Sequence, residues 1–158
     1  MNKGIIIGIV VVVVIVGIAG AFLAIPQGPP APQAKTTQLE AREFGFEGLG
    51  YKLSDNQYKG GPSITVKAGE TVRIVMKNSG GTNHEFMIVS EIPKQAKEHP
   101  EAAIQGAMTD EVKPGETKTS TFVAGKAGKY YYVCLLDVAT APDRHVDRGM
   151  FGEFIVQG

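Results

Sequence analysis

The chain lacks net charge, because its sixteen lysines and arginines balance its sixteen aspartates and glutamates. A protein that binds nucleic acid through its phosphates shows a basic excess or a basic patch. The 158 residues carry no such excess. The composition therefore gives no support for nucleic acid as a partner.

Cysteine is nearly absent too, and Cys134 is the only one in the chain. A single cysteine cannot form a disulfide within its own chain. A lone cysteine is ordinarily a small buried apolar residue, and that explanation stays open for Cys134. In an exported domain, however, an unpaired cysteine calls for a further explanation.

Charge is missing from a long apolar run, Gly4 to Ile25. As a helix, this run would extend roughly 33 Å, which is enough to cross a bilayer. We predict that residues 1–25 form a membrane anchor, and a cleaved signal peptide is the alternative. Lys3 precedes the run and the next charge is Lys35. The positive-inside rule then places the rest of the chain outside the cytoplasm, on a single-pass anchor in the cell membrane.

Four prolines fall within residues 26–37, which predicts a semi-rigid linker. The folded domain is expected to occupy residues 38–158. Within it, short stretches alternate apolar and polar side chains, and glycine or proline separates them, as in 63–80, 112–124 and 150–158. Only residues 93–106 have a helix-like pattern. The sequence therefore predicts an all-β, antiparallel sandwich.

Potential metal ligands gather near the end of the chain. Cys134 ends one predicted strand, His145 and Met150 follow it, and His84 opens an earlier strand. Taken singly, a loop histidine is solvated and a methionine before a strand fills the core. Together, two imidazoles, a thiolate and a thioether are the ligand set of a type 1 copper site.

These segments resemble the cupredoxin family of plastocyanin-like blue copper proteins, and in particular its membrane-anchored archaeal sulfocyanin-like members. The similarity rests on Asn78-Ser79-Gly80 leading to "NHEF" at 83–86, on "VKPGET" at 112–117 and on "GKYYYVC…H…GMFGEFIV" at 128–156. It implies a Greek-key sandwich and one copper, Cu(I)/Cu(II), per chain. The ligands that match the family are His84, Cys134, His145 and Met150.

The resemblance also assigns supporting roles. Asn83, Glu85, Tyr132 and Phe151 are expected beside the ligands or on an electron path. His145 is expected at the surface, within an apolar docking patch of Leu135, Leu136, Val138, Ala139, Ala141, Pro142 and Phe151. Arg144 and Arg148 flank this patch, and they either pair with the neighbouring Asp143 and Asp147 or steer a charged partner. Ten residues separate Cys134 from His145, more than is usual for the family's electron carriers.

The leading functional hypothesis is a carrier of single electrons between redox proteins, such as respiratory complexes or oxidases, without enzymatic activity. The alternative from another class is a copper sequestration or delivery protein. An oxidase or nitrite reductase is disfavoured, because those enzymes place a histidine beside the type 1 cysteine and Cys134 lies between Val133 and Leu135. A metal-free adhesion sandwich would leave the ligand pattern unexplained.

Overall fold

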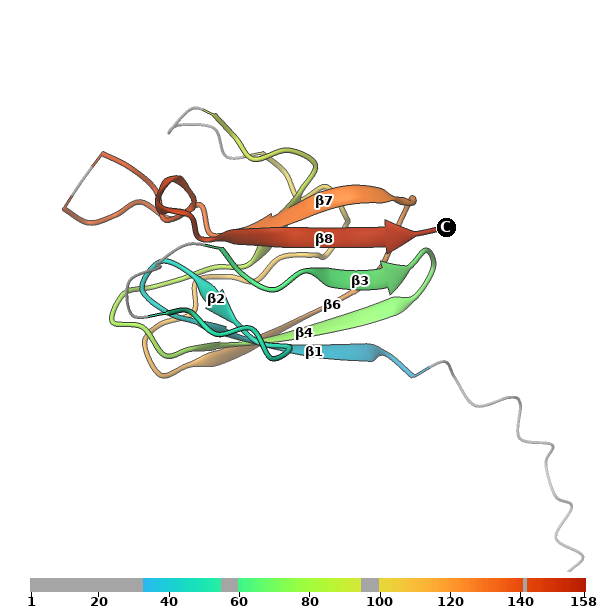
Figure 1. Ribbon diagram of the computed structural model, residues 1–158, viewed down its shortest axis with the longest axis horizontal. Helices are drawn as coiled ribbons and strands as arrows, with labels where there is room; N and C mark the ends of the chain where they lie inside the picture. Colours follow the sequence, from blue (N-terminus) through green and yellow to red (C-terminus); the bar gives the residue numbers. More distant parts are fainter. Residues whose placement is uncertain (1–32, 55–59, 95–99, 141) are drawn as a thin grey trace, which may run out of the picture. The chain divides into compact units, whose positions relative to one another are not determined.

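The computed structural model describes residues 33–54, 60–94, 100–140 and 142–158. They form two four-stranded sheets that lie as two layers (Figure 1). The first sheet has the order β2–β1–β4–β6, with bounds β1 Lys35–Ala41, β2 Phe46–Glu47, β4 Thr71–Asn78 and β6 Thr117–Val123. The second has the order β3–β8–β7–β5, with bounds β3 Ile64–Lys67, β5 Met87–Val89, β7 Gly128–Val133 and β8 Phe151–Gln157.

The core lies between the two sheets and follows the alternation of the strands. Side chains at every second position of β4 are buried, namely Val72, Ile74 and Met76. From the second sheet, β3, β7 and β8 contribute residues to the same cluster, including Ile64, Tyr132 and Phe154. Successive side chains of a strand point to opposite faces, so one stripe of each strand enters the core. The predicted all-β sandwich is confirmed.

The predicted antiparallel pairing is wrong for two strand pairs. β1 runs parallel to β4, and β3 runs parallel to β8, so both sheets are mixed. The chain leaves the first sheet after β2, adds β3 to the second sheet and returns as β4. A period-two pattern shows which face of a strand is buried, but it does not show the direction of the neighbouring strand.

The helix-like stretch forms no helix in its described part, residues 93–94 and 100–106; residues 95–99 lie outside the description. The single helical turn among the described residues is η1, Val146–Arg148. Nowhere in those residues is there a helix with the length and apolar character needed to cross a bilayer. The predicted anchor at 1–25 lies outside the described residues, as does most of the linker, and β1 begins at Lys35.

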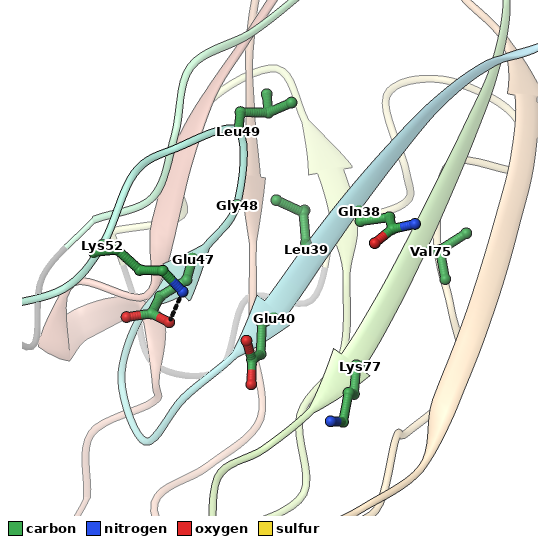
Figure 2. A pocket seen from close by; sticks show the side chains of 9 residues that line it. All are labelled: Gln38, Leu39, Glu40, Glu47, Gly48, Leu49, Lys52, Val75 and Lys77. Carbon is green, nitrogen blue, oxygen red and sulfur yellow. Dashed lines mark hydrogen bonds and ion pairs between the residues drawn. The ribbon is translucent and has the colours of Figure 1, made fainter.

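The long connection between β7 and β8 lies at one end of the sandwich, on the left in Figure 1, whereas the C-terminus lies at the other. Elsewhere, a hollow of about 280 Å³ lies against β1, β2 and β4. Figure 2 shows its side chains, among them the ion pair of Lys52 with Glu47. Among the described residues, its lining contains no histidine or cysteine.

Candidate metal centre

His84 is held by a loop that Asn78 organises. The buried Asn78 side chain donates from Nδ2 to the carbonyls of Thr82 and Val112, both at 2.7 Å. Its Oδ1 accepts the Gly80 N–H at 2.9 Å. The N–H and C=O of His84 both bond to Val112. One amide thus satisfies three backbone groups and fixes the position from which the imidazole projects.

Gly80 leaves room for the His84 ring. A Cβ at position 80 would lie 2.9 Å from His84 Nε2 and 3.1 Å from the backbone carbon of Arg42. Real side chains do not tolerate so short a contact with backbone on one side and a buried ring on the other. Glycine is therefore required here for close packing.

Cys134 follows the last residue of β7, and its side chain is fully buried. The Glu85 N–H points at Cys134 Sγ at 3.4 Å, and Glu85 Oε1 accepts the Leu135 N–H at 3.0 Å. Glu85 therefore joins the His84 segment to the Cys134 segment through both its backbone and its carboxylate. Glu85 thus lies beside two predicted ligands, and its supporting role stays a prediction.

The ten-residue connection from Cys134 to His145 is folded onto itself. The Val138 N–H donates to the Asp143 carbonyl, and the His145 N–H donates to the Leu136 carbonyl, both at 2.9 Å. Arg144 is fully buried and donates to the Pro93 carbonyl and to the Asp147 carboxylate. A buried guanidinium with several acceptors holds the connection in one conformation.

A short turn carries the chain from His145 to Met150. His145 caps η1, which ends at Gly149 with a left-handed φ of 101°. The Met150 N–H donates to the His145 carbonyl at 3.0 Å, and the Met150 carbonyl accepts the Cys134 N–H at 3.2 Å. The backbone of the buried Met150 is therefore bonded to both of these predicted ligands.

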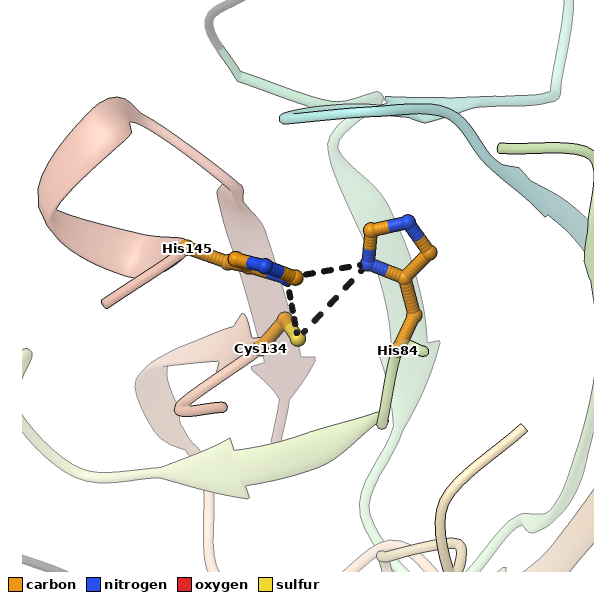
Figure 3. A group of neighbouring side chains, drawn as sticks. All are labelled: His84, Cys134 and His145. Carbon is orange, nitrogen blue, oxygen red and sulfur yellow. Dashed lines mark hydrogen bonds between the residues drawn. The ribbon is translucent and has the colours of Figure 1, made fainter. Parts of the chain in front are cut away.

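Three donor atoms converge in the interior, as Figure 3 shows. His84 Nδ1 lies 3.1 Å from His145 Nδ1, and Cys134 Sγ lies 3.4 Å from His145 Nδ1 and 3.9 Å from His84 Nδ1. Donors about 2.0–2.3 Å from one shared metal, in a trigonal arrangement, would lie roughly 3.5–3.8 Å apart. The observed separations lie around those values, so this His–Cys–His cluster fits a single ion of a metal that binds nitrogen and sulfur.

Burial keeps all three groups neutral when no metal is bound. It raises the pKa of the Cys134 thiol to about 12. Burial, with His145 close by, lowers the pKa of His84 to about 4. Burial lowers the pKa of His145, and the positive charge of Arg148 lowers it further. A metal ion must therefore displace the thiol proton, whereas the imidazoles are already in the form that binds metal.

His145 is less exposed than expected, with 2 % of its surface accessible. Phe44 packs edge-on against its ring, with 5.6 Å between the ring centroids, and the Arg148 guanidinium lies 4.7 Å from the centroid of Phe44. His145 nevertheless lines a hollow of about 490 Å³, which we call the His145 hollow. Its apolar walls are Phe44, Leu136, Val138 and Ala139.

The predicted docking patch is therefore only partly correct. Leu135 is fully buried. Phe151 packs against a second apolar cluster, which includes Leu135 and Val133. Ala141 lies outside the described residues. Local pairing of the charges is confirmed, because Arg144 binds Asp147 and Arg148 binds Asp143.

The other predicted supporting residues lie in different surroundings. Asn83 is exposed and donates to the Glu111 carboxylate at 2.9 Å. Tyr132 is buried in the core, and its hydroxyl donates to the Pro62 carbonyl at 2.6 Å. Sequence reasoning missed Phe44. It included Asn78 and Gly80 in the segment that supports the family resemblance, but it gave neither of them a role.

Comparison with known proteins agrees with this fold. The model of the multicopper oxidase family matches residues 25–158. The copper-resistant cuproprotein CopI of Rubrivivax gelatinosus is 30% identical over 114 residues, which are 66% of this chain and 63% of that protein. The chain thus covers less than two thirds of the length of this relative.

Two solved structures show the same fold. Auracyanin A, a blue copper protein of Chloroflexus aurantiacus, superposes with a TM-score of 0.53 and 20% identity, over 79% of this chain and 100% of that one. Rusticyanin of Thiobacillus ferrooxidans superposes with a TM-score of 0.55 and 25% identity, over 79% of each chain. With its two-layer β fold and buried His–Cys–His cluster, the chain belongs to the multicopper oxidase family and has the cupredoxin-like fold.

Proposed function

We propose that the chain is a type 1 copper protein that carries single electrons between redox proteins. The observation that carries this proposal is the buried cluster of His84 Nδ1, Cys134 Sγ and His145 Nδ1, with separations of 3.1–3.9 Å. Met150, buried and bonded through its backbone to both Cys134 and His145, is the proposed fourth ligand. Copper held there supplies a Cu(I)/Cu(II) couple.

The residues around the cluster favour electron transfer over catalysis. All four proposed ligands are buried, and the hydrogen bonds of Asn78 and Glu85 fix the segments that carry them. A rigid, closed site excludes substrate and keeps rearrangement small when the charge of the site changes. Beyond His84 and His145, the chain has only one further histidine, His99, too few for a second histidine-rich metal centre.

The proposed setting is the extracytoplasmic side of a cell membrane. The uncharged run from Gly4 to Ile25 supports an N-terminal anchor, and Lys3 before it supports a cytoplasmic N-terminus. An anchored carrier remains near membrane-bound donors and acceptors, such as respiratory complexes or oxidases.

A visible spectrum of the full-length chain with Cu(II) tests the site. We expect an intense thiolate-to-copper charge-transfer band, which Cys134→Ser abolishes because the thiolate is its source. His99→Asn is the matched control and should keep the band, since His99 is not a proposed ligand. A Cys134→Ser protein that keeps the wild-type colour with copper bound would refute the assignment.

A count of bound metal tests whether the chain acts as an enzyme. We expect one copper per chain and no sustained turnover of oxygen or nitrite. Metal analysis and a steady-state assay on one sample check both statements. Two coppers per chain together with sustained turnover would overturn the carrier assignment.

Copper sequestration or delivery is the second candidate, and the similarity to the copper-resistant cuproprotein CopI favours it. Repeated cycles of dithionite reduction and ferricyanide oxidation, with a Cu(I) chelator present, separate the two functions. A carrier keeps its copper and its colour through the cycles, because its buried ligands suit both oxidation states. A delivery protein loses the metal to the chelator.

A further inference from the structure

The His145 hollow is the place where a proposed ligand meets the surface. Among the four proposed ligands, only His145 belongs to its lining. Its walls are apolar, but Glu111 and Asp137 also line it. Both carboxylates are exposed, so a partner that covers the hollow must meet their charges.

Hydrogen bonds hold two carboxylates in place at this end of the molecule. Asn83 Nδ2 donates to Glu111 Oε2 at 2.9 Å, and the Gly81 N–H donates to Glu43 Oε1 at 2.6 Å. In the described part of the chain, no lysine or arginine forms an ion pair with Glu43, Glu111 or Asp137. Glu43 precedes Phe44 and Gly81 precedes Thr82, and Phe44 and Thr82 both line the hollow, so the Glu43 carboxylate lies at its edge.

The nearby cations do not cancel these charges. Arg148 is paired with Asp143 at 2.7 Å, and the fully buried Arg144 is paired with Asp147 at 3.0 Å. Among the described residues, no lysine or arginine lines the hollow. Since the whole chain has zero net charge, the excess of carboxylates around the hollow is a local feature and not a property of the whole molecule.

We propose that the His145 hollow docks a redox protein whose contact face carries lysine or arginine around an apolar centre. This inference rests on the proposed carrier function and specifies its partner. Apolar walls fit the centre of such a face, and the three carboxylates attract its rim. A second copy of the chain would bring the same carboxylates against each other, and an acidic partner would be repelled.

The first experiment measures charge preference without any electron transfer. The full-length chain in a neutral detergent, in its metal-free or Cu(I) form, is titrated with hexaamminechromium(III) and, separately, with hexacyanochromate(III). These paramagnetic, redox-inert ions carry equal and opposite charges and broaden nearby amide signals. We expect the cation to broaden the signals of Asn83, Leu136 and Ala139, and the anion to leave them sharp.

Variants show which charges are responsible. The double variant Glu111→Gln and Asp137→Asn should weaken the cation effect roughly tenfold at low salt, because a trivalent ion senses each lost charge across only a few ångströms. Glu70→Gln removes one charge at the turn before β4, at the other end of the strand from the His84 loop, and should change nothing. Equal broadening by both ions, or broadening that the double variant leaves intact, overturns the proposal.

The second experiment measures docking through kinetics. The reduced copper protein is oxidised by tris(phenanthroline)cobalt(III) and by hexacyanoferrate(III) over a range of salt concentrations. The rate with the cation should fall as salt rises, and the rate with the anion should increase. The opposite pattern refutes a cationic partner. Absence of copper or of electron transfer, with the chromium result intact, would refute the proposed function and leave the charge preference standing.

Discussion

At the scale of single residues, Glu85 places a negative charge beside the proposed metal ligands. Its N–H points at Cys134 Sγ, and its carboxylate accepts the Leu135 N–H. A fixed anion stabilises the more positive oxidation state of a nearby metal. Glu85 therefore combines a structural bond with an electrostatic effect, and substitution separates the two.

Glu85→Gln should raise the reduction potential of the copper form while its colour persists. Glutamine keeps an oxygen for the Leu135 N–H but loses the charge. A loss of about 1 kcal/mol of stabilisation corresponds to roughly 40 mV for one electron. Voltammetry measures the shift, and Glu70→Gln is the control for net charge. An unchanged potential in Glu85→Gln would show that the carboxylate has only a structural role.

The metal-free protein should lose stability in mild acid because of His84. Its folded pKa of about 4 lies below the ordinary value of 6.5, so between these values the unfolded chain binds a proton that the folded chain does not. Stability is therefore complete above pH 6.5, falls as pH decreases towards 4 and then levels off, with a total loss of up to about 3 kcal/mol.

Urea unfolding of the metal-free chain at several pH values measures this loss. His145, whose pKa is also lowered, contributes in the same direction. His99→Asn should show the same pH profile as the wild type. A free energy of unfolding that stays constant between pH 6.5 and 4.5 would contradict the assignment of buried, neutral histidines.

At the scale of elements, the site depends on loops that meet at one end of two sheets. Asn78→Ala removes the bonds to Thr82, Val112 and Gly80. We expect it to cost about 2–4 kcal/mol, because buried backbone groups lose their partners, and to broaden the copper band as His84 loses its fixed position. Denaturant unfolding and the visible spectrum check both effects. Full stability with an unchanged band would mean that water replaces the amide.

Much of this arrangement was readable in the sequence, because alternation identifies buried faces. The alternation within 63–80 places Val72, Ile74 and Met76 on one face of a strand, and all three lie in the core. The convergence of His84, Cys134 and His145 followed from chemical type and family pattern. The direction of the strands could not be predicted in this way, and neither could the position of Phe44 against His145. Both depend on contacts between segments that are distant in the sequence. Arg144 was read as a surface charge, and its burial depends on the Pro93 carbonyl, 51 residues away.

At the scale of the whole molecule, the sandwich contains all four proposed ligands. A chain that begins at Ala34 should fold cooperatively and bind copper like the full chain, because β1 starts at Lys35 and all proposed ligands follow it. Thermal unfolding and the copper spectrum of the two proteins make the comparison. A shortened chain that cannot fold would place the domain boundary before residue 34.

The direction of β1 and β8 has a practical consequence. Lys35 pairs with Val72, and Ala41 pairs with Asn78, so β1 starts about 20 Å from the end of the sandwich that carries His84. Gly158 follows the far end of β8, away from the β7–β8 connection (Figure 1). Attachment of the domain to an electrode or a bead at the start of β1 or at Gly158 would leave the His145 hollow facing the solution. The same geometry favours fusion of another protein before β1 or after β8, because the His145 hollow then stays accessible.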